Sequence, residues 1–286
     1  MHSLAGTGAE VISEVIVVDN SSHDDSTEAA RRAGAQLIAN ATNRGFAAAA
    51  NQGAQAASGN SILLLNPDTE LVEGLDRLVA TLDQNPGAGA VAGVLVDAIT
   101  GHPQRGFSVR RFPRFSTFAF EVLGINRLWP GNPVNARYRC LDLDLRQPQE
   151  IDQPAGACLM VRKEVWDRLN GFDESYYPLW FEDVDFCLRL RQAGLKILLE
   201  PNCRLLHQGG HSLETIGFRE RQLYWYGNLF YYVRKNIGSA ATLGIRVLVC
   251  FGACARIAVA MLSGRFGQIE AFRAVIRLAL RGKRNV

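Results

Sequence analysis

The chain has 286 residues, a hydrophobic content of 48% and a formal net charge of +3. This composition is ample for a folded core, and the length fits one large domain or one domain with an appendage. The six cysteines lack metal-ligand spacing and the first residues lack the pattern of a signal peptide, which predicts reduced thiols in a cytosolic protein.

Short apolar segments alternate with helical patterns over the first hundred residues. Strands are predicted at residues 14–18, 36–39, 61–65 and 90–96, with helices ending near 34, opening at 43–53 and covering about 73–84. This alternation predicts an α/β fold, with a mostly parallel sheet covered by helices on both faces. Ligands of such sheets bind beyond the carboxyl ends of the strands, where Asp19 and Asp68 are found.

Residues 101–150 contain five prolines and are predicted to be irregular. An irregular stretch of this length inside a domain is usually functional or mobile. Its first part interleaves arginines with phenylalanines: Arg105, Arg110, Arg111 and Arg114 with Phe107, Phe112 and Phe115. Two interpretations are open, a solvated loop and a flap over an anionic substrate.

Three carboxylates, Glu182, Asp183 and Asp185, open a predicted helix that ends at Gly194. Acids are favoured in the first turn of a helix by the positive end of its dipole, so all three could be structural. Alternatively, one carboxylate packed against the preceding aromatic residues has a raised pKa and serves as a general base.

Two further strands are predicted on either side of this helix. They cover residues 156–162 and 196–199, and we expect Pro201 to end the second strand. Beyond it, His207 and His211 flank a glycine pair. A lone histidine is usually structural, but two of them just beyond a strand suggest a site.

Residues 213–286 differ in character from the rest of the chain. A helix rich in aromatic residues is predicted at 214–235, before an apolar segment at 240–262. A spanning helix needs about 20 apolar residues with few charges. Because Arg246 and Arg256 interrupt this segment, we expect it to lie in a membrane interface.

Three arginines, Arg273, Arg277 and Arg281, repeat every four residues and so share one face of the last predicted helix. With apolar neighbours, they are typical of a basic amphipathic helix on an anionic membrane surface. A helix that packs back on the domain is the alternative. We therefore expect two parts, residues 1–212 and residues 213–286, with a membrane surface and no nucleic acid among the partners.

Several motifs follow one another along the chain: Val17–Ser22, Asn43–Phe46 with Asn51–Gly53, Leu65–Asp68, Gly156–Arg162, Gly171–Glu174, Phe181–Asp185 and His207–Gly210. Together they resemble family 2 glycosyltransferases of the GT-A fold, and most of all the bacterial rhamnosyltransferase-like branch. The resemblance covers residues 14–212, and the ordered set carries it, since each motif alone is weak.

The resemblance implies an inverting transfer of a sugar from a nucleotide donor to an acceptor hydroxyl. It implies dTDP-rhamnose as the donor and a cell-surface glycan or lipid-linked acceptor, with the enzyme peripheral on the cytoplasmic face of the membrane. A UDP- or GDP-sugar transferase of the same fold and a non-catalytic nucleotide-binding homologue are the alternatives. A hydrolase would need a second acid facing Asp183, and we identify none.

The resemblance also implies roles for individual residues. The nucleotide-sugar would contact Asp19, Asn43, Arg44, Asn51, Asn66 and Asp68. The metal ligands would be Asp68 and His207, for Mg²⁺ or Mn²⁺, and a histidine ligand favours Mn²⁺. The base would be Asp183, with Glu182 beside it at the acceptor. The acceptor or sugar pocket would include Gly156, Trp180 and Phe181.

The chain departs from the family pattern in two places. Asn66 replaces the first acid of an Asp-X-Asp motif, which weakens the expectation of metal dependence. The family's first strand, which lies in mid-sheet, has no counterpart in the thirteen residues before Glu14. We expect a groove with unpaired backbone groups, each costing about 1–3 kcal/mol if buried, and hypothesise a truncated reading of a longer protein or a weakened homologue.

Overall fold

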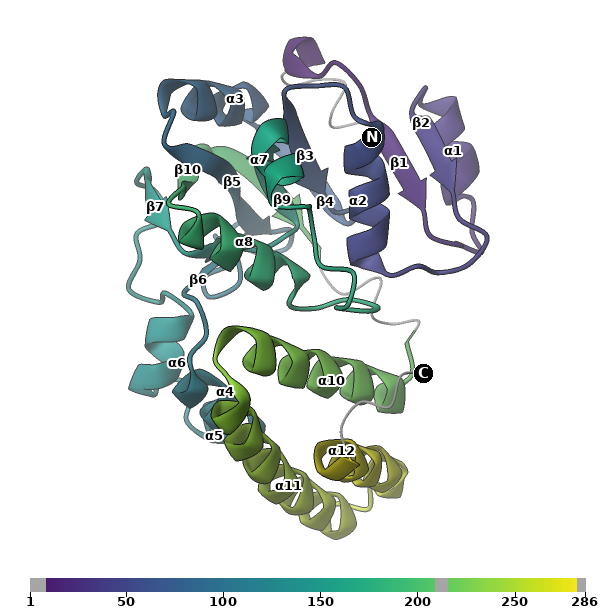
Figure 1. Ribbon diagram of the computed structural model, residues 1–286, viewed down its shortest axis with the longest axis vertical. Helices are drawn as coiled ribbons and strands as arrows, with labels where there is room; N and C mark the ends of the chain where they lie inside the picture. Colours follow the sequence, from purple (N-terminus) through teal and green to yellow (C-terminus); the bar gives the residue numbers. More distant parts are fainter. Residues whose placement is uncertain (1–8, 209–215, 282–286) are drawn as a thin grey trace.

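The computed structural model describes residues 9–208 and 216–281 (Figure 1). A layered α/β part contains the strands, and a helical part lies beyond one end of the sheet. The α/β fold class predicted from the alternation of strands and helices is confirmed.

The central sheet has six strands and is mixed in direction. Its order is β3 (Ser61–Leu65), β9 (Cys158–Arg162), β5 (Ala88–Asp97), β10 (Lys196–His207) and β4 (Thr69–Glu73), with β7 (Gln149–Ile151) also paired to β10. Strands β5 and β10 are parallel, whereas β9 is antiparallel to both β3 and β5. Therefore β3, β5 and β10 run in one direction, and β9, β4 and β7 run against them.

Strands β1 (Ile16–Asp19) and β2 (Gln36–Ala39) form a separate parallel pair. Among the described residues, β1 pairs only with β2 and β3 only with β9, so no strand joins the two sheets. Apolar side chains of β1 are consequently only half-buried, although their β-branched run is typical of a buried strand. This arrangement is consistent with the expected lack of a strand in mid-sheet.

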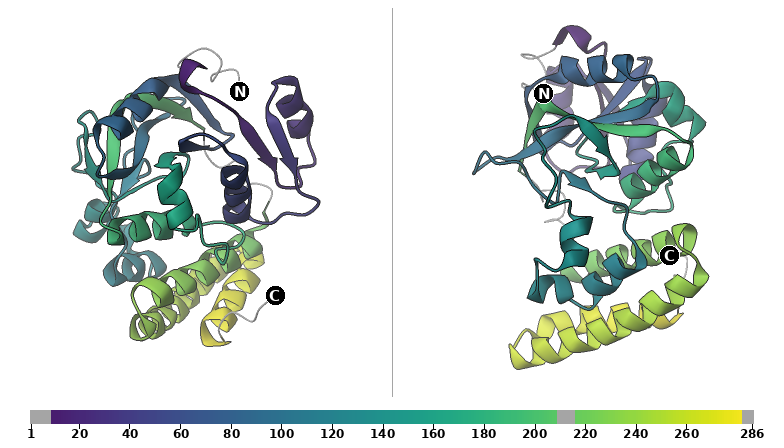
Figure 2. Two further views of the ribbon diagram at one scale, coloured as in Figure 1. Left: turned by 45° about the horizontal axis from the view of Figure 1, so that its top comes forward. Right: turned by 90° about the vertical axis from the view of Figure 1, so that its left-hand side faces the viewer.

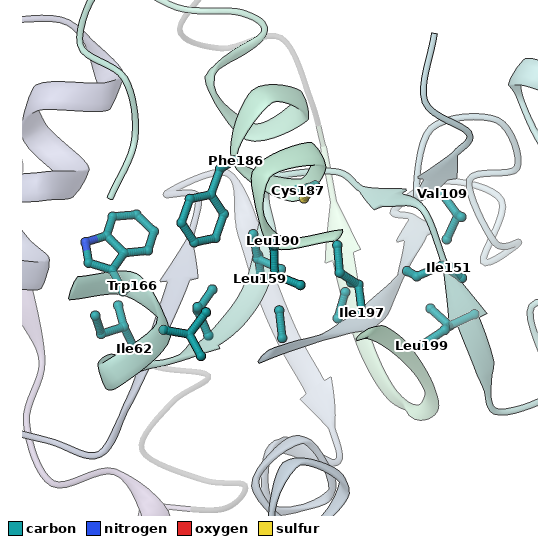
Figure 3. Close-up of a cluster of buried hydrophobic side chains, with 14 of the residues drawn as sticks. Ile62, Val109, Ile151, Leu159, Trp166, Phe186, Cys187, Leu190, Ile197 and Leu199 are labelled. Atoms are coloured by element: carbon teal, nitrogen blue, oxygen red, sulfur yellow. The ribbon is translucent and has the colours of Figure 1, made fainter. Parts of the chain in front are cut away.

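Helices cover both faces of the central sheet, because alternate residues of its strands enter different cores. One face packs on α8 (Glu182–Gln192) and α7 (Lys163–Arg168), where Phe186 and Leu190 meet Leu159 and Ile197 (Figure 3). The other face packs on α3 (Leu75–Gln84). Helices α1 (Ser26–Arg32) and α2 (Phe46–Ala56) accompany the β1–β2 pair, and a 3₁₀ turn, η2 (Ala9–Val11), precedes it.

The prediction that residues 101–150 are irregular is wrong. They contain β6 (Val109–Arg110), α4 (Phe115–Val122), α5 (Ile125–Leu128), α6 (Pro133–Tyr138) and β7, and β6 pairs with β8 (Gln153–Pro154). Pro133 begins α6, with the Asn132 side chain accepting the Asn135 N–H as the N-cap. A proline at that position starts a helix and does not break it.

The prediction that Pro201 ends a strand is also wrong. Strand β10 continues through it to His207, and the pairing register with β5 shifts between Leu199 and Arg204. A bulge accommodates a residue that lacks a backbone donor, so proline is tolerated there. The extra length matters, because the end of β10 carries His207 into the site described below.

The C-terminal part contains α10 (Phe218–Asn236), α11 (Ser239–Leu262), η3 (Phe266–Gln268) and α12 (Ile269–Arg281). Together with α4 they enclose a second core, which also receives Tyr176 and Phe181 from the segment before α8. Helix α10 lies next to the α/β layer, and α11 and α12 lie side by side farthest from the sheet (Figure 2). The predicted division at residue 212 falls outside the described residues and stays a prediction.

Candidate active site

The start of α8 has an unusual backbone. Trp180 and Phe181, the two residues before the helix, have φ angles of 78° and 75°. Left-handed backbone costs about 1–3 kcal/mol for a bulky residue and tends to occur at functional sites. This backbone marks the first turn of α8, which contains Glu182 and Asp183, as a candidate site.

Asp183 is held by the backbone on two sides. Its Oδ2 accepts the Gly156 N–H at 3.2 Å, and its Oδ1 accepts the Val184 N–H at 2.8 Å. Burial raises the pKa of Asp183, and these hydrogen bonds and the charge of Arg110 only partly oppose that effect. A fixed, half-buried carboxylate with a raised pKa fits the requirements of a general base.

Glu182 is more deeply buried, and only 5% of the residue is exposed. Burial, followed by the negative charge of Asp183, raises the pKa of Glu182 well above its ordinary value. Its Oε2 has no hydrogen-bond partner in the described part of the chain. The environment therefore favours the protonated form of Glu182.

Asp185, the third acid, has a structural environment and is fully buried. Its carboxylate accepts hydrogen bonds from Arg189 Nε at 2.8 Å, Lys235 Nζ at 2.9 Å, and Tyr176 Oη and Asn236 Nδ2 at 3.1 Å each. Asp185 anchors α8 to α10, which fits the structural interpretation for this one acid. The interpretation of Asp183 as a general base stays a prediction.

Asp68 and His207 face one another across the β4–β10 pairing. Thr69 is paired with His207, which places the Asp68 Oδ2 3.7 Å from His207 Nε2. The Gln104 amide nitrogen donates to the His207 carbonyl, so its oxygen must face His207 Nδ1, at 3.0 Å. Nδ1 therefore donates to Gln104, and Nε2 is the ring nitrogen that faces the carboxylate.

This donor pair fits a cation. Asp68 Oδ1 is buried with no hydrogen-bond partner among the described residues, and a buried carboxylate oxygen without a partner costs free energy unless a positive charge lies beside it. No group of three or more His, Cys, Asp or Glu ligands occurs in the part of the chain that the structure describes. A cation here would need substrate oxygens or water as further ligands, as Mg²⁺ often does.

Residues 104–110, part of the stretch for which the sequence left a solvated loop and a flap open, contact the candidate site. Phe107 stacks on the His207 ring at a centroid distance of 5.0 Å, and Gln104 holds Nδ1. Arg110 lies over the Phe107 ring and acts on the charge of Asp183. Sequence reasoning missed Gln104, because its role depends on a contact over 103 residues of chain.

The two halves of the site meet at the start of β9. The Asn66 N–H donates to the Ala157 carbonyl at 3.1 Å, and the adjacent Gly156 N–H is the group that holds Asp183. The loop from Asn66 to Asp68 and the first turn of α8 are therefore hydrogen-bonded to two adjacent residues. This juxtaposition brings together residues that lie far apart in the sequence.

Predicted donor-binding residues gather at the end of β1. Asp19 is 8% exposed and accepts the Ser22 N–H, and Asn20 bonds to the side chain of Asn43 and the backbone N–H of Arg44. Asn20, which sequence reasoning did not select, thus holds the two loops together. The turn that contains it was visible in the sequence, but its partners were not.

Three predicted residues have structural contacts. Asn51 bonds both the N–H and the carbonyl of Phe172, each at 2.9 Å, so its amide is occupied. The Phe181 ring packs among Phe118 and Tyr232 in the second core, and Trp180 beside it is half-buried. The predicted partner of His207 in its motif, His211, lies outside the described residues.

Two cavities adjoin one another near the site, and His207 lines one of them. One, of about 500 Å³, is lined in part by Asp97, Gln104 and His207, and the other, of about 470 Å³, includes Asp144. They share the surface around Arg105. Their size suits a substrate, although Asp183 lines neither of them.

Residues 6–169 match the family described as glycosyl transferase family 2, and residues 141–208 match the N-terminal domain of galactosyltransferase. The chain belongs to glycosyl transferase family 2. It is 28% identical over 213 residues to the N-acetylglucosaminyl-diphospho-decaprenol L-rhamnosyltransferase of Mycobacterium tuberculosis, covering 69% of this chain and 67% of that one. It is 31% identical over 132 residues to rhamnosyltransferase WbbL of Escherichia coli, covering 46% of each. The chain is a glycosyltransferase, and these two relatives are rhamnosyltransferases.

Solved structures share the fold of this glycosyltransferase. GalNAc-T7 with UDP, GalNAc and Mn²⁺ superimposes with a TM-score of 0.55 at 15% identity, over 80% of this chain and 47% of that one. The mannosyltransferase PcManGT of Pyrobaculum calidifontis, with GDP-Man and Mn²⁺, gives a TM-score of 0.52 at 15% identity, over 95% and 79%. At such identities the likeness establishes the GT-A fold alone.

Proposed function

We propose that this glycosyltransferase transfers rhamnose from dTDP-rhamnose to a hydroxyl of a lipid-linked or cell-surface glycan acceptor, with inversion. The observation that carries the proposal is that Asp183 and the loop that holds Asp68 bond to adjacent residues, Gly156 and Ala157, while Asp68 faces His207. Asp183 is the carboxylate proposed to remove the proton, and the Asp68–His207 pair is proposed to bind a cation. Displacement of a nucleoside diphosphate needs both functions.

In this proposal Asp183 removes the proton of the acceptor hydroxyl as the bond to the sugar forms. Gly156 and Val184 hold its oxygens through their N–H groups, so the carboxylate does not have to be oriented during the reaction. Glu182, protonated by its burial, donates a hydrogen bond toward the acceptor. Trp180 and Phe181 shape the acceptor wall, with the Phe181 ring anchored in the second core.

Asp68 and His207 are proposed to hold Mn²⁺ or Mg²⁺, which neutralises the charge of the departing diphosphate when bound. Gln104 fixes the tautomer of His207, as the outer partner of a metal-binding histidine commonly does. Asp19, Asn43 and Arg44 are proposed to contact the nucleotide, and Asn66 to position its loop. For Asn51 we propose support of the 171–174 turn in place of direct contact.

The donor is tested first by isothermal titration with dTDP, UDP and GDP, each with and without Mn²⁺. We expect dTDP to bind most tightly and Mn²⁺ to tighten it, with Asp68→Asn removing the effect of Mn²⁺. Tighter binding of UDP or GDP would instead identify a transferase for the corresponding sugar. The names of the two bacterial relatives above support rhamnose.

A second candidate is a non-catalytic nucleotide-binding chain of the same fold. The separation of the β1–β2 pair from the central sheet favours it, because the nucleotide side of the site then rests on a two-stranded sheet. Transfer from dTDP-rhamnose that disappears in Asp183→Asn would exclude this candidate. Nucleotide binding without any transfer would support it.

The enzyme is proposed to work as a peripheral protein on the cytoplasmic face of the membrane. Helix α11 is long and apolar enough to cross a membrane, by length and composition alone, and 28% of its most apolar window is buried. A lipid-linked acceptor would be presented at that surface. Activity toward a lipid-linked acceptor in vesicles, compared with a soluble analogue, tests this placement.

A further inference from the structure

The exposed side chains of α11 form one uncharged stripe. Beyond Ser239 and Ala240 at its start, they recur every three or four residues along the helix and comprise Leu243, Val247, Phe251, Cys254, Ala255, Ala258, Val259, Met261 and Leu262. Phe251 is 65% exposed and Leu262 is 90% exposed. Residues spaced in this way share one face of a helix. The stripe therefore runs along most of a helix of 24 residues, about 36 Å long at the usual rise of 1.5 Å.

The two arginines of α11 do not enter the stripe. Arg256 donates to the carbonyl of Val122 at 2.6 Å and lies at the end of α4. The Arg246 guanidinium lies 5.3 Å from the centre of the Phe230 ring. Both guanidinium groups thus contact neighbouring helices. The two arginines interrupt the apolar segment in the sequence, but they do not interrupt the exposed face of α11.

The opposite face of α11 belongs to the second core. Ile245, Val249 and Ala253 are fully buried in it, together with residues of α4, α10 and α12. Helix α10 in turn is tied to the active-site helix through Lys235 and Asp185. A spanning α11 would have to leave these contacts, so in this fold only the exposed stripe is available to lipid.

The surroundings of the stripe are basic and aromatic. Helix α12 lies beside α11 in the layer farthest from the sheet (Figure 2), and it exposes Arg273 and Arg281, as well as Arg277, which is paired with Glu270. Helix α5 starts close to Arg256, and the residues at its end, Leu128 and Trp129, are 87% and 59% exposed. Apolar residues flanked by arginine and tryptophan match the interface of an anionic bilayer.

We infer that the stripe of α11 docks flat on an anionic membrane surface, with the arginines of α12 contacting lipid phosphates. A contiguous uncharged stripe of this length is unusual on a monomeric soluble protein unless it binds something. The inference rests on the proposed function, because a lipid-linked acceptor is the reason for the enzyme to bind a membrane. It deepens that function by naming the surface that docks. Its test measures vesicle binding and not transfer, so the two can fail separately.

The test is co-sedimentation of the full chain with vesicles of phosphatidylcholine alone and with 30% phosphatidylglycerol. We expect binding to the anionic vesicles, weakened several-fold by raising the salt concentration. The double variant Val247→Asp/Phe251→Asp should lower the partition coefficient about ten-fold or more. Val72→Asp is the matched control, since Val72 is a 43% exposed apolar residue that lies in β4, outside the stripe. This variant should bind vesicles as the wild type does.

A second variant separates charge from apolar contact. Arg273→Gln/Arg281→Gln should remove the preference for anionic vesicles and leave dTDP binding unchanged. Four results would overturn the inference. The first two are no binding of the folded wild type to either vesicle and equal binding by the aspartate double variant. The third is a lipid-free dimer that this variant converts to a monomer, and the fourth is resistance of the bound protein to alkaline carbonate, because it would indicate a spanning helix.

Discussion

Replacement of Asp185 by asparagine separates the structural acid of α8 from the reactive one. The carboxylate is fully buried and accepts four hydrogen bonds, two of them from the cations Arg189 and Lys235. An amide keeps one acceptor oxygen and loses the negative charge. Breaking a buried ion pair from one side costs about 3–5 kcal/mol.

The remaining contacts place the expected loss at the lower end of that range. Lys235 keeps Asp173 at 2.7 Å, and Arg189 keeps hydrogen bonds to two backbone carbonyls. We therefore expect Asp185→Asn to lower the free energy of unfolding by about 3 kcal/mol, which corresponds to a fall in Tm of about 6–12 °C. Thermal unfolding followed by circular dichroism measures it.

Asp183→Asn is the matched control, two positions away on the same turn. Burial raises the pKa of Asp183, which means that the fold disfavours its charge at neutral pH. A neutral amide removes that charge but keeps only one of the two accepted N–H bonds, so Asp183→Asn should change Tm by less than Asp185→Asn does. An Asp185→Asn variant that melts within about 2 °C of the wild type, or an Asp183→Asn variant that is the less stable of the two, would refute the reasoning.

Three further predictions concern catalysis, the metal and the backbone. Asp183→Asn should lower kcat by about 10²–10⁴-fold. In the wild type, activity should fall with decreasing pH through the raised pKa of Asp183, so the acid limb of kcat/KM should lie above the ordinary value of 3.8; a limb at or below that value would contradict this. Gln104→Ala should weaken Mn²⁺ binding about 10–100-fold, because it frees the tautomer of His207, and unchanged calorimetric affinity would exclude that role. Gly74→Ala should lower the free energy of unfolding, measured by chemical denaturation, by more than about 1 kcal/mol. The reason is that Gly74 has φ of 81° and a Cβ would lie 2.1 Å from the Asn202 carbonyl oxygen. Gly87→Ala is the control and should not destabilise the protein, because a Cβ at Gly87 would meet open space.

Most of the chain could be assigned from local patterns. The strands at 36–39 and 61–65 were predicted with the bounds that the structure gives, and the helix opened by the three acids ends before Gly194 as expected. These segments are determined by β-branched runs, caps and helix stops close in sequence. The errors at residues 101–150 and at Pro201 share a cause, because prolines were taken as breaks where a helix start and a bulge accommodate them.

The sequence by itself determined the family, the α/β fold and the set of polar residues from which the site is built. Only the tertiary structure decided which of these residues are enclosed by neighbouring helices and which face the candidate site. Asp183 and Asp185 are equivalent acids in the sequence, and they differ because one faces Gly156 and the other is enclosed by α10. Likewise, Arg246 and Arg256 lie in the apolar segment of the sequence but face neighbouring helices in the fold. The physical reason is that the pKa of a side chain and its exposure depend on contacts made across many residues of chain, which no local pattern specifies.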